Sequence, residues 1–451
     1  MTQQNDIKSI MRPLAQEIID YTMQAGKDYG VSDVKVSLSA DTETSLHVEE
    51  GEVSKDLYGA SSVFSMTIYA GDKVVSFSKD SFDSTAIKHA IDENLKIINL
   101  VPENPDQRLL DADKVYKGEV PELNLYDTKP PSHSDLVKYA VQVEKKALAQ
   151  DNIKTTRDTV VSKNEMHRLA LATNGLDQEK SSSFYTAYTI TIAEGESGMQ
   201  TGYASSAARH FKDLTPASKL GVKAGKNAAA RLNPSLPQTG EYPIVLDKST
   251  AAMFFQSVLN AIDGTAVYRG ATFLKDELGK QVMHKDITIE DCPRVKKGLA
   301  SSPVDSAGLE SHDIKFIEAG VLKQFNMSVQ EARKLNKEPI GRQNGTTNVR
   351  VHPGQQTPED LMKDIKEGIY IEGFNGGTVN ISNGTHSRQA YGKLIKDGKV
   401  TDIAVEGFVV SGNLKDMFMN AIVANDTPKD FKKNSFLAPT TRINGLTIAG
   451  K

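Results

Sequence analysis

The sequence predicts an α+β protein with an N-terminal α+β region over residues 1–235 and a β-rich C-terminal domain over residues 238–451. Helical and strand-like segments occur in the same order twice before residue 235. From Gln238 onward, short strand-like runs alternate with glycine turns and only a few helices. A chain of 451 residues is long enough for two to three domains with sizeable cores.

The N-terminal region is predicted to contain two αββββα units. In the first, helices at about 13–29 and 84–98 enclose the runs VKVSL, SLHVEEGEV, SSVFSMTIYAGD and KVVSFS. In the second, helices at about 135–150 and 217–232 enclose the runs DTVVSK, HRLALATNG, SSFYTAYTITIAEGE and GMQTGYASS. Apolar residues at helical spacing define the helices, and alternation of apolar and polar residues defines the strands.

Glycine spacing favours an internal duplication of this unit. Gly51 and Gly175 end the second strands, Gly71 and Gly195 end the third strands, and each pair is 124 residues apart. The same offset places Met66 on Ile190, which preserves the apolar face of the strand. We therefore expect repeats at about 1–100 and 134–235. The alternative is one mixed domain without symmetry.

A proline-rich connector is predicted to join the two units. Five of the 17 prolines lie between Pro102 and Pro131, in a segment with weak periodicity and many turn formers.

The C-terminal domain is predicted to consist mainly of short strands. Expected strands are PIVLD, DITIED, the hairpin HDIKFIEAGVLKQFNMS, GTVNISNG, GKLIKDGKVTDIAVEGFVVSG and RINGLTIAG, and expected helices span about 249–262, 329–335, 358–368 and 414–423.

Composition excludes several classes of protein. The net charge is −4 with no basic block, which argues against a nucleic-acid partner. The N-terminus lacks the apolar core of a signal peptide and no run of about 18 apolar residues occurs, so we expect a cytoplasmic protein without membrane association. The single cysteine, Cys292, excludes an intrachain disulfide framework and is interpreted as a semi-buried side chain.

The expected helix at 249–262 carries polar residues that do not suit metal chemistry. Gln256, Ser257 and Asn260 form hydrogen bonds but neither titrate near neutral pH nor bind zinc well. We therefore expect these three residues to be candidate contacts in a peptide-binding cavity. The closest pair of the nine histidines, His284 and His312, is 28 residues apart, so no local zinc-peptidase motif exists. A site assembled from scattered histidines is the alternative, and it would draw on His284, His312, His352 or His386.

Polar residues near glycine turns are candidate contacts for a peptide. Tyr268 and Arg269 follow the helix just described, and Arg342 and Arg388 lie in GRQNG and THSRQA. A guanidinium holds a carboxylate through two parallel hydrogen bonds, so each arginine is a candidate for binding a peptide terminus. The alternative for each is a surface arginine paired with a nearby carboxylate.

Three C-terminal stretches resemble the TldD/PmbA family, whose members are also called TldE or modulators of DNA gyrase. They are SVLNAIDGTAVYRGATFLKDELGKQV, DCPRVKKGLASSPVDSAGLESHDIKFIEAGVLKQFNMSVQEARKL and SGNLKDMFMNAIVANDT, in that order. The segments VYRG, GLASSPVDSAGL and SGNLKDMF resemble the PmbA/TldE branch more closely than TldD. The N-terminal helices and strands also fit the family, so the resemblance covers nearly the whole chain.

The resemblance implies a role in a heterodimeric zinc peptidase that cleaves unfolded or small peptides. Catalytic members carry H-E-x-x-x-H on this helix and a cysteine ligand near the C-terminus. The corresponding positions here are Gln256, Ser257 and Ala261, and the C-terminal region has no cysteine. The resemblance therefore implies a chain that is not catalytic alone, binds no cofactor, and pairs with a TldD-like subunit that holds the zinc. The alternative is a stand-alone homodimeric peptide-binding or regulatory protein.

Overall fold

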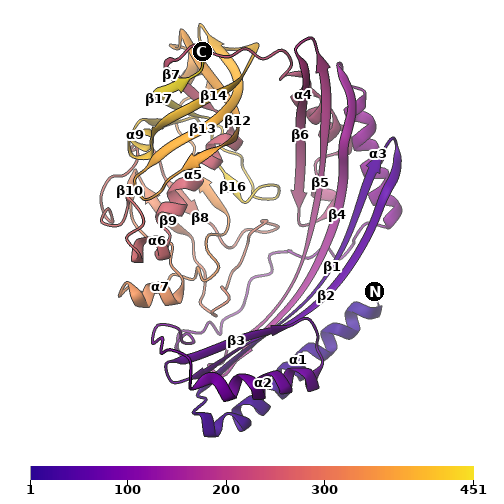
Figure 1. The fold of residues 1–451 in the computed structure, drawn as a ribbon, viewed down its shortest axis with the longest axis vertical. Helices are drawn as coiled ribbons and strands as arrows, with labels where there is room; N and C mark the ends of the chain where they lie inside the picture. Colours follow the sequence, from indigo (N-terminus) through magenta and orange to yellow (C-terminus); the bar gives the residue numbers. More distant parts are fainter. Residues whose placement is uncertain (1) are drawn as a thin grey trace.

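A computed structural model describes residues 2–451, with side chains from residue 8 onward. It contains one long six-stranded antiparallel sheet and a C-terminal region built on two further sheets (Figure 1). The mixture of helices and strands confirms the α+β class.

The long sheet has the strand order β3-β2-β1-β4-β5-β6. Its strands are β1 (Asp33–Glu49), β2 (Glu52–Ala70), β3 (Lys73–Lys79), β4 (Ile153–Ala172), β5 (Asp177–Gly195) and β6 (Gly198–Ala208). The first strand of each half, β1 and β4, pair with each other at the centre, so the order is symmetric about that pair. The tight turns after β1 and β4 contain Gly51 and Gly175 at φ 82° and 89°, a conformation that glycine adopts without strain.

Each unit has three strands and not the four expected. The runs VKVSL and SLHVEEGEV belong to one continuous strand, β1, and DTVVSK and HRLALATNG both belong to β4. The polar residues between the runs do not end the strands. Asp41, Glu43 and Ser45 instead continue the strand: Asp41 and Glu43 are partly or fully exposed, whereas Ser45 is buried with its hydroxyl 2.9 Å from the Ser162 hydroxyl. The units are therefore αβββα.

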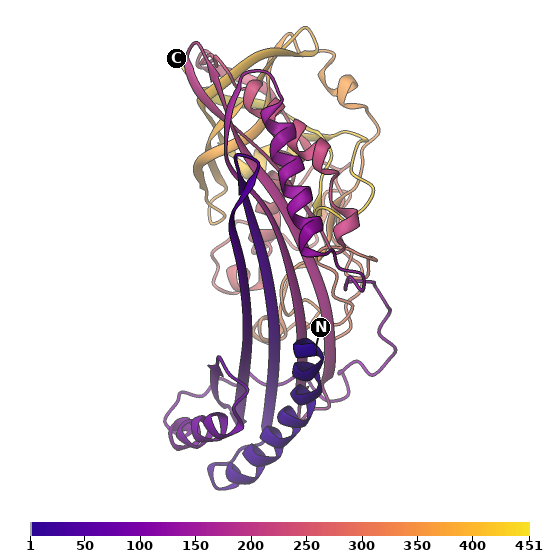
Figure 2. The same ribbon diagram turned by 90° about the vertical axis from the view of Figure 1, so that its right-hand side faces the viewer.

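Four helices cover one face of this sheet, in two pairs. Even-numbered residues of β1 contact both pairs: Val36 packs in the cluster with α1 (Thr2–Ala25) and α2 (Ser84–Ile98), and Leu46 in the cluster with α3 (His133–Leu148) and α4 (Ala217–Ala229). The pairs lie at opposite ends of the strands, with the C-terminal region behind the sheet (Figure 2). The odd-numbered face of β1 is left facing the C-terminal region.

The C-terminal region contains a six-stranded sheet, a five-stranded sheet and the largest core cluster. The six-stranded order is β14-β13-β12-β7-β17-β15, and the five-stranded order is β10-β9-β8-β11-β16. Their strands are β7 (Gly240–Leu246), β8 (Ile289–Asp291), β9 (Ile314–Glu318), β10 (Val321–Leu322), β11 (Val349–Val351), β12 (Glu367–Val379), β13 (Thr385–Lys396), β14 (Lys399–Asn413), β15 (Ala421–Val423), β16 (Phe436–Leu437) and β17 (Thr441–Ala449). The helices are α5 (Lys248–Ala261), α6 (Gly264–Tyr268), α7 (Val329–Lys334), α8 (Pro358–Met362) and α9 (Leu414–Met419).

The helix expected over 358–368 is wrong in its second half. Only α8 is helical, and the chain enters β12 at Glu367. Ile369 and Ile371 are fully buried and alternate with less buried residues, which is the period of a strand.

The connector between the two units lies against the C-terminal region. Arg333 of α7 donates to the backbone carbonyl oxygens of Arg108 and Leu109, both at 2.7 Å. Leu110 and Val115 form a small buried cluster with Val329. The described residues include no helix long and apolar enough to cross a membrane.

Candidate functional site

Helix α5 lies between β12 of one C-terminal sheet and β16 of the other (Figure 1). Asp247 caps its N-terminus, because the Asp247 carboxylate accepts a hydrogen bond from the Thr250 backbone N–H at 2.7 Å. Phe254, Phe255 and Val258 anchor it in the largest core. Packing of this apolar face fixes which residues of the helix reach solvent.

The positions that resemble the zinc motif do not share one face of α5. Gln256 and Asn260 are exposed, and their side chains hydrogen-bond at 3.2 Å. Ser257 is 6% exposed and Ala261 is fully buried. Residues five apart on an α-helix differ by about 140° in direction, which accounts for the opposite environments of Gln256 and Ala261.

The remaining predicted contacts lie in different environments, and three of them are accessible to solvent at least in part. Tyr268 and Arg269 are exposed at the end of α6, with the Lys334 ammonium 5.0 Å from the Tyr268 ring centre. Arg388 on β13 is half-buried, with its guanidinium 4.4 Å from the Phe374 ring centre. Arg388 has no carboxylate partner among the described residues, so it stays a candidate peptide contact.

Arg342 is not available to a peptide. Its Nε lies 2.5 Å from Asp291 Oδ2, and both side chains are fully buried. Its other nitrogens donate to the backbone carbonyl oxygens of Gly341 and His312. The expectation of a peptide contact at Arg342 is therefore wrong.

The four C-terminal histidines do not assemble into a metal site. His284, His312 and His352 each lie near a different carboxylate, at distances of 2.9–3.6 Å. His386 is buried, which lowers its pKa to about 4. Within residues 2–451 as described, no three His, Cys, Asp or Glu side chains are grouped so that they could hold a metal ion.

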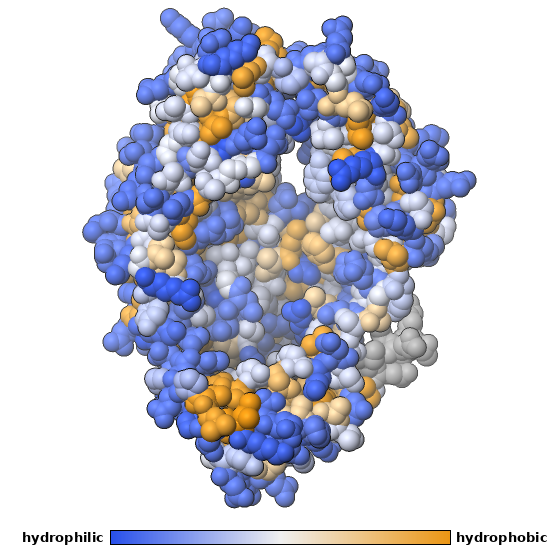
Figure 3. All heavy atoms as spheres, in the orientation of Figure 1, coloured by the Kyte–Doolittle hydropathy of each residue, from blue (hydrophilic) through white to orange (hydrophobic). Residues whose placement is uncertain are grey.

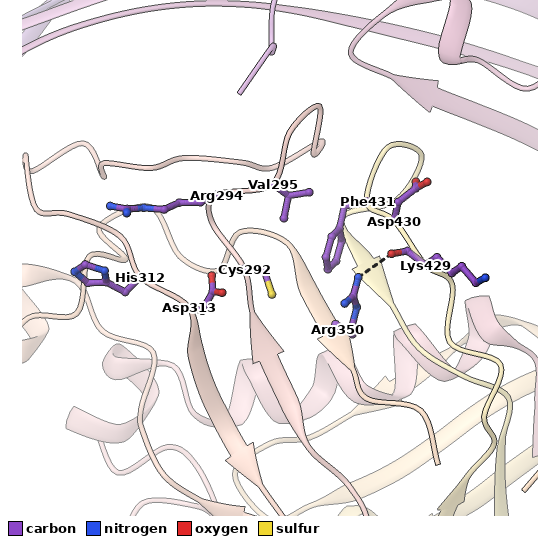
Figure 4. Close-up of a pocket in the computed structure, with 9 residues that line it drawn as sticks. All are labelled: Cys292, Arg294, Val295, His312, Asp313, Arg350, Lys429, Asp430 and Phe431. Atoms are coloured by element: carbon purple, nitrogen blue, oxygen red, sulfur yellow. Dashed lines mark hydrogen bonds between the residues drawn. The ribbon is translucent and has the colours of Figure 1, made fainter. Parts of the chain in front are cut away.

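Cys292 lines a pocket of about 450 Å³ at the end of β8. Arg350, Asp313 and Phe431 surround it (Figure 4), and the Arg350 guanidinium lies 4.9 Å from the Phe431 ring centre. Burial, assisted by the charge of Glu290, raises the pKa of the Cys292 thiol to about 12. A thiol with this pKa is a poor nucleophile at neutral pH.

We therefore expect iodoacetamide to alkylate Cys292 of the folded protein on the order of a thousandfold more slowly than free cysteine at pH 8, because so little thiolate is present. Mass spectrometry of timed samples measures this rate. The same reaction in denaturant is the control and is expected to reach the rate of a free thiol. Comparable rates in folded and unfolded protein would contradict the buried-thiol interpretation.

A larger cavity was not anticipated from the sequence. The molecule is hollowed between the long sheet and the C-terminal region (Figure 3), and a cavity of about 1010 Å³ lies there. Its walls come from β1, β4, β5, the connector at 120–128 and the segment 301–306. The lining residues are spread from Ser37 to Asn344, so no local motif indicated the cavity.

The helices and sheets define an α+β protein, and comparison with known proteins identifies its family. Residues 126–232 match the PmbA/TldA metallopeptidase central domain, and residues 239–450 match the C-terminal domain of the same family. The chain belongs to the PmbA/TldD family, which confirms the resemblance seen in the sequence.

Relatives cover almost the whole chain. Metalloprotease PmbA of Escherichia coli O157:H7 is 28% identical over 441 residues, which are 96% of this chain and 97% of that protein. A PmbA homolog of Haemophilus influenzae is 26% identical over 442 residues, covering 96% of both chains.

Solved structures share the fold at low sequence identity. A crystal structure from Bacteroides thetaiotaomicron, described as a modulator of DNA gyrase, has a TM-score of 0.90 at 23% identity and covers 98% of this chain and 99% of its own. TldE from Thermococcus kodakarensis has a TM-score of 0.82 at 20% identity and covers 97% and 100% of the two chains.

Proposed function

We propose that this chain is the non-catalytic, PmbA/TldE-like subunit of a cytoplasmic zinc metallopeptidase complex that degrades unfolded or small peptides. The observation that carries the proposal is α5, which lies in the segment matched to the metallopeptidase family and has Gln256, Ser257 and Ala261 at the positions to which the sequence resemblance assigns the zinc motif. None of these side chains binds zinc well or activates a zinc-bound water. A TldD-like partner subunit would supply the metal, and this chain would complete the peptide chamber.

The purified chain is expected to contain no stoichiometric zinc and to leave unstructured peptides uncleaved. Elemental analysis and a fluorogenic peptide assay measure the two properties. One tightly bound zinc per chain, lost together with activity on treatment with a chelator, would contradict this prediction. The alternative site would then be sought among His284, His312, His352 and His386.

Mixing the chain with a TldD-like protein from the same cell is expected to produce a heterodimer with peptidase activity. Size-exclusion chromatography with light scattering measures the assembly, and the peptide assay is run on each component and on the mixture. Recovery only as a self-dimer, without stimulation of the partner, would instead support a stand-alone homodimeric peptide-binding or regulatory protein.

A further inference from the structure

The cavity between the long sheet and the C-terminal region has the size of a ligand site. Its volume of about 1010 Å³ is at the upper end of the range for ligand pockets, roughly 300–1,000 Å³. It lies on the sheet face that the helices leave uncovered, where the sheet curves around the C-terminal region (Figure 1).

Three basic side chains in the cavity wall have no carboxylate partner among the described residues. Lys180 Nζ donates to the Val304 carbonyl oxygen at 2.7 Å. Arg209 donates to the carbonyl oxygens of Ser183 and Leu299, and its Nε is buried without an acceptor. Arg168 is exposed and makes no hydrogen bond to the described side chains or backbone. Backbone carbonyls carry only partial charges, so they offset these positive charges only in part, and among the carboxylates Asp305 exerts a favourable charge interaction on Lys180.

The acidic residues of the wall do not balance them. Glu179 accepts a hydrogen bond from Arg12 on the helix-covered side. Glu122 accepts one from the backbone N–H of Asn124. Asp305, behind the wall, accepts three backbone N–H groups.

Burial dominates the pKa values of Lys180 and Arg209, and for Lys180 it outweighs the opposing effect of the Asp305 charge. Desolvation lowers the pKa of Lys180 and lowers the pKa of Arg209 to about 10. An anion bound in the cavity would offset the free-energy cost of removing these cations from water.

The same cavity surrounds an unpaired strand edge. β6 pairs with β5 only from Tyr185 onward, so no strand covers the outer edge of β5 from 177 to 184. One backbone hydrogen bond joins this segment to the connector: the Ser183 N–H donates to the Leu125 carbonyl oxygen at 3.0 Å. Residues from both faces of β5, Lys180 and Ser181, line the cavity, so it extends around the edge. An exposed edge is a template on which an extended peptide can add as a further strand.

We propose that this cavity binds an extended acidic peptide, which pairs with the edge of β5 at 177–182 and places its carboxylates near Arg168, Lys180 and Arg209. The inference rests on the proposed function only in taking the ligand to be a peptide, because the cavity is formed by this chain alone. Tyr126 is the one aromatic side chain among the described lining residues, and its ring already contacts His167 at 5.5 Å between ring centres. The wall therefore lacks the open stacking surfaces that single-stranded nucleic acids use.

Fluorescence anisotropy with labelled ten-residue peptides tests the proposal on the isolated full chain. The probes are an unstructured peptide with four glutamates and two matched peptides with glutamine or lysine at those positions. The glutamate peptide is expected to bind about tenfold more tightly than the glutamine peptide at low salt, and more weakly as salt increases. Equal binding of all three peptides, or tighter binding of a single-stranded oligonucleotide, would overturn the proposal.

Variants locate the binding site. Arg168→Gln is expected to weaken binding of the glutamate peptide about tenfold without unfolding the protein, since Arg168 is exposed. Arg157→Gln is the matched control, because it removes the same charge. Arg157 is also an exposed arginine on β4, and it lies outside the cavity wall. Equal effects of the two variants would mean that only net charge matters and would overturn the site.

Hydrogen exchange tests the strand pairing. Binding is expected to slow exchange at amides within 177–184, while the unpaired outer edge of β2 at 52–62 serves as an internal control. Equal protection at both edges, or at neither, would overturn the strand-addition geometry. Acidic-peptide binding without association to a TldD-like protein would contradict the proposed function and leave this inference standing. Peptide cleavage by the heterodimer without any preference for acidic peptides would support the proposed function and contradict this inference.

Discussion

Replacing Arg342 with methionine is expected to destabilise the protein by about 3–5 kcal/mol, the usual effect of breaking a buried ion pair. Arg342 and Asp291 are both fully buried, and Asp291 also accepts the Thr347 backbone N–H at 2.9 Å. Methionine fills much of the volume of arginine but supplies no positive charge. The Asp291 carboxylate would then be left buried without its counter-ion.

Urea unfolding measures this loss, with Lys114→Met as the control. Lys114 and Glu338 form an exposed ion pair, whose removal is expected to change stability by less than about 1 kcal/mol. The double variant Arg342→Met with Asp291→Leu is expected to recover part of the loss, because it removes both charges. A loss below about 1 kcal/mol for Arg342→Met alone would show that the pair is not buried in solution.

Restoring the zinc motif through Gln256→His, Ser257→Glu and Ala261→His is expected to give a destabilised chain that still binds no stoichiometric zinc. Gln256 is exposed whereas Ala261 is fully buried, so two imidazoles at these positions would point in different directions. Enlarging Ala261 in a packed core costs about 1–3 kcal/mol. A glutamate at the buried position 257 adds the penalty of an unpaired charge.

Elemental analysis and urea unfolding of the triple variant test this expectation. The control is Gln256→His with Asn260→His, which places both imidazoles on the exposed face one turn apart and is expected to fold normally. A triple variant that folds with full stability and holds one zinc per chain would contradict it. α5 would then be a zinc-peptidase helix that has lost only its ligands.

Periodicity in the sequence predicted the elements whose pattern is regular. The helix at 84–98 agrees with α2, because apolar residues such as Ile87, Ile91 and Leu95 follow one stripe. Sequence periodicity failed to predict segments whose secondary structure depends on their tertiary surroundings. The polar stretch 41–45 resembles a loop in isolation and remains a strand because β2 pairs with it on one side and β4 on the other.

The candidate site could be predicted in its chemistry but not in its geometry. Missing zinc ligands on α5 are visible in the residue types alone. The burial of Arg342 depends on Asp291, 51 residues earlier, and nothing local in the sequence indicates that pair. The cations Arg168 and Arg209 become neighbours of one cavity only once the long sheet and the segment 301–306 have come together.

The central pairing of β1 with β4 also constrains how the chain is made. During synthesis, β1 is fully translated at Glu49, but its partner strand β4 is fully translated only at Ala172. The edge of β1 that pairs with β4 is unpaired in the interval. At translation speeds of about 5–20 residues per second, that interval lasts roughly 6–25 s. A nascent chain therefore presents a long unpaired edge throughout this time, which makes the first unit a natural client for chaperones that shield strand edges on the ribosome.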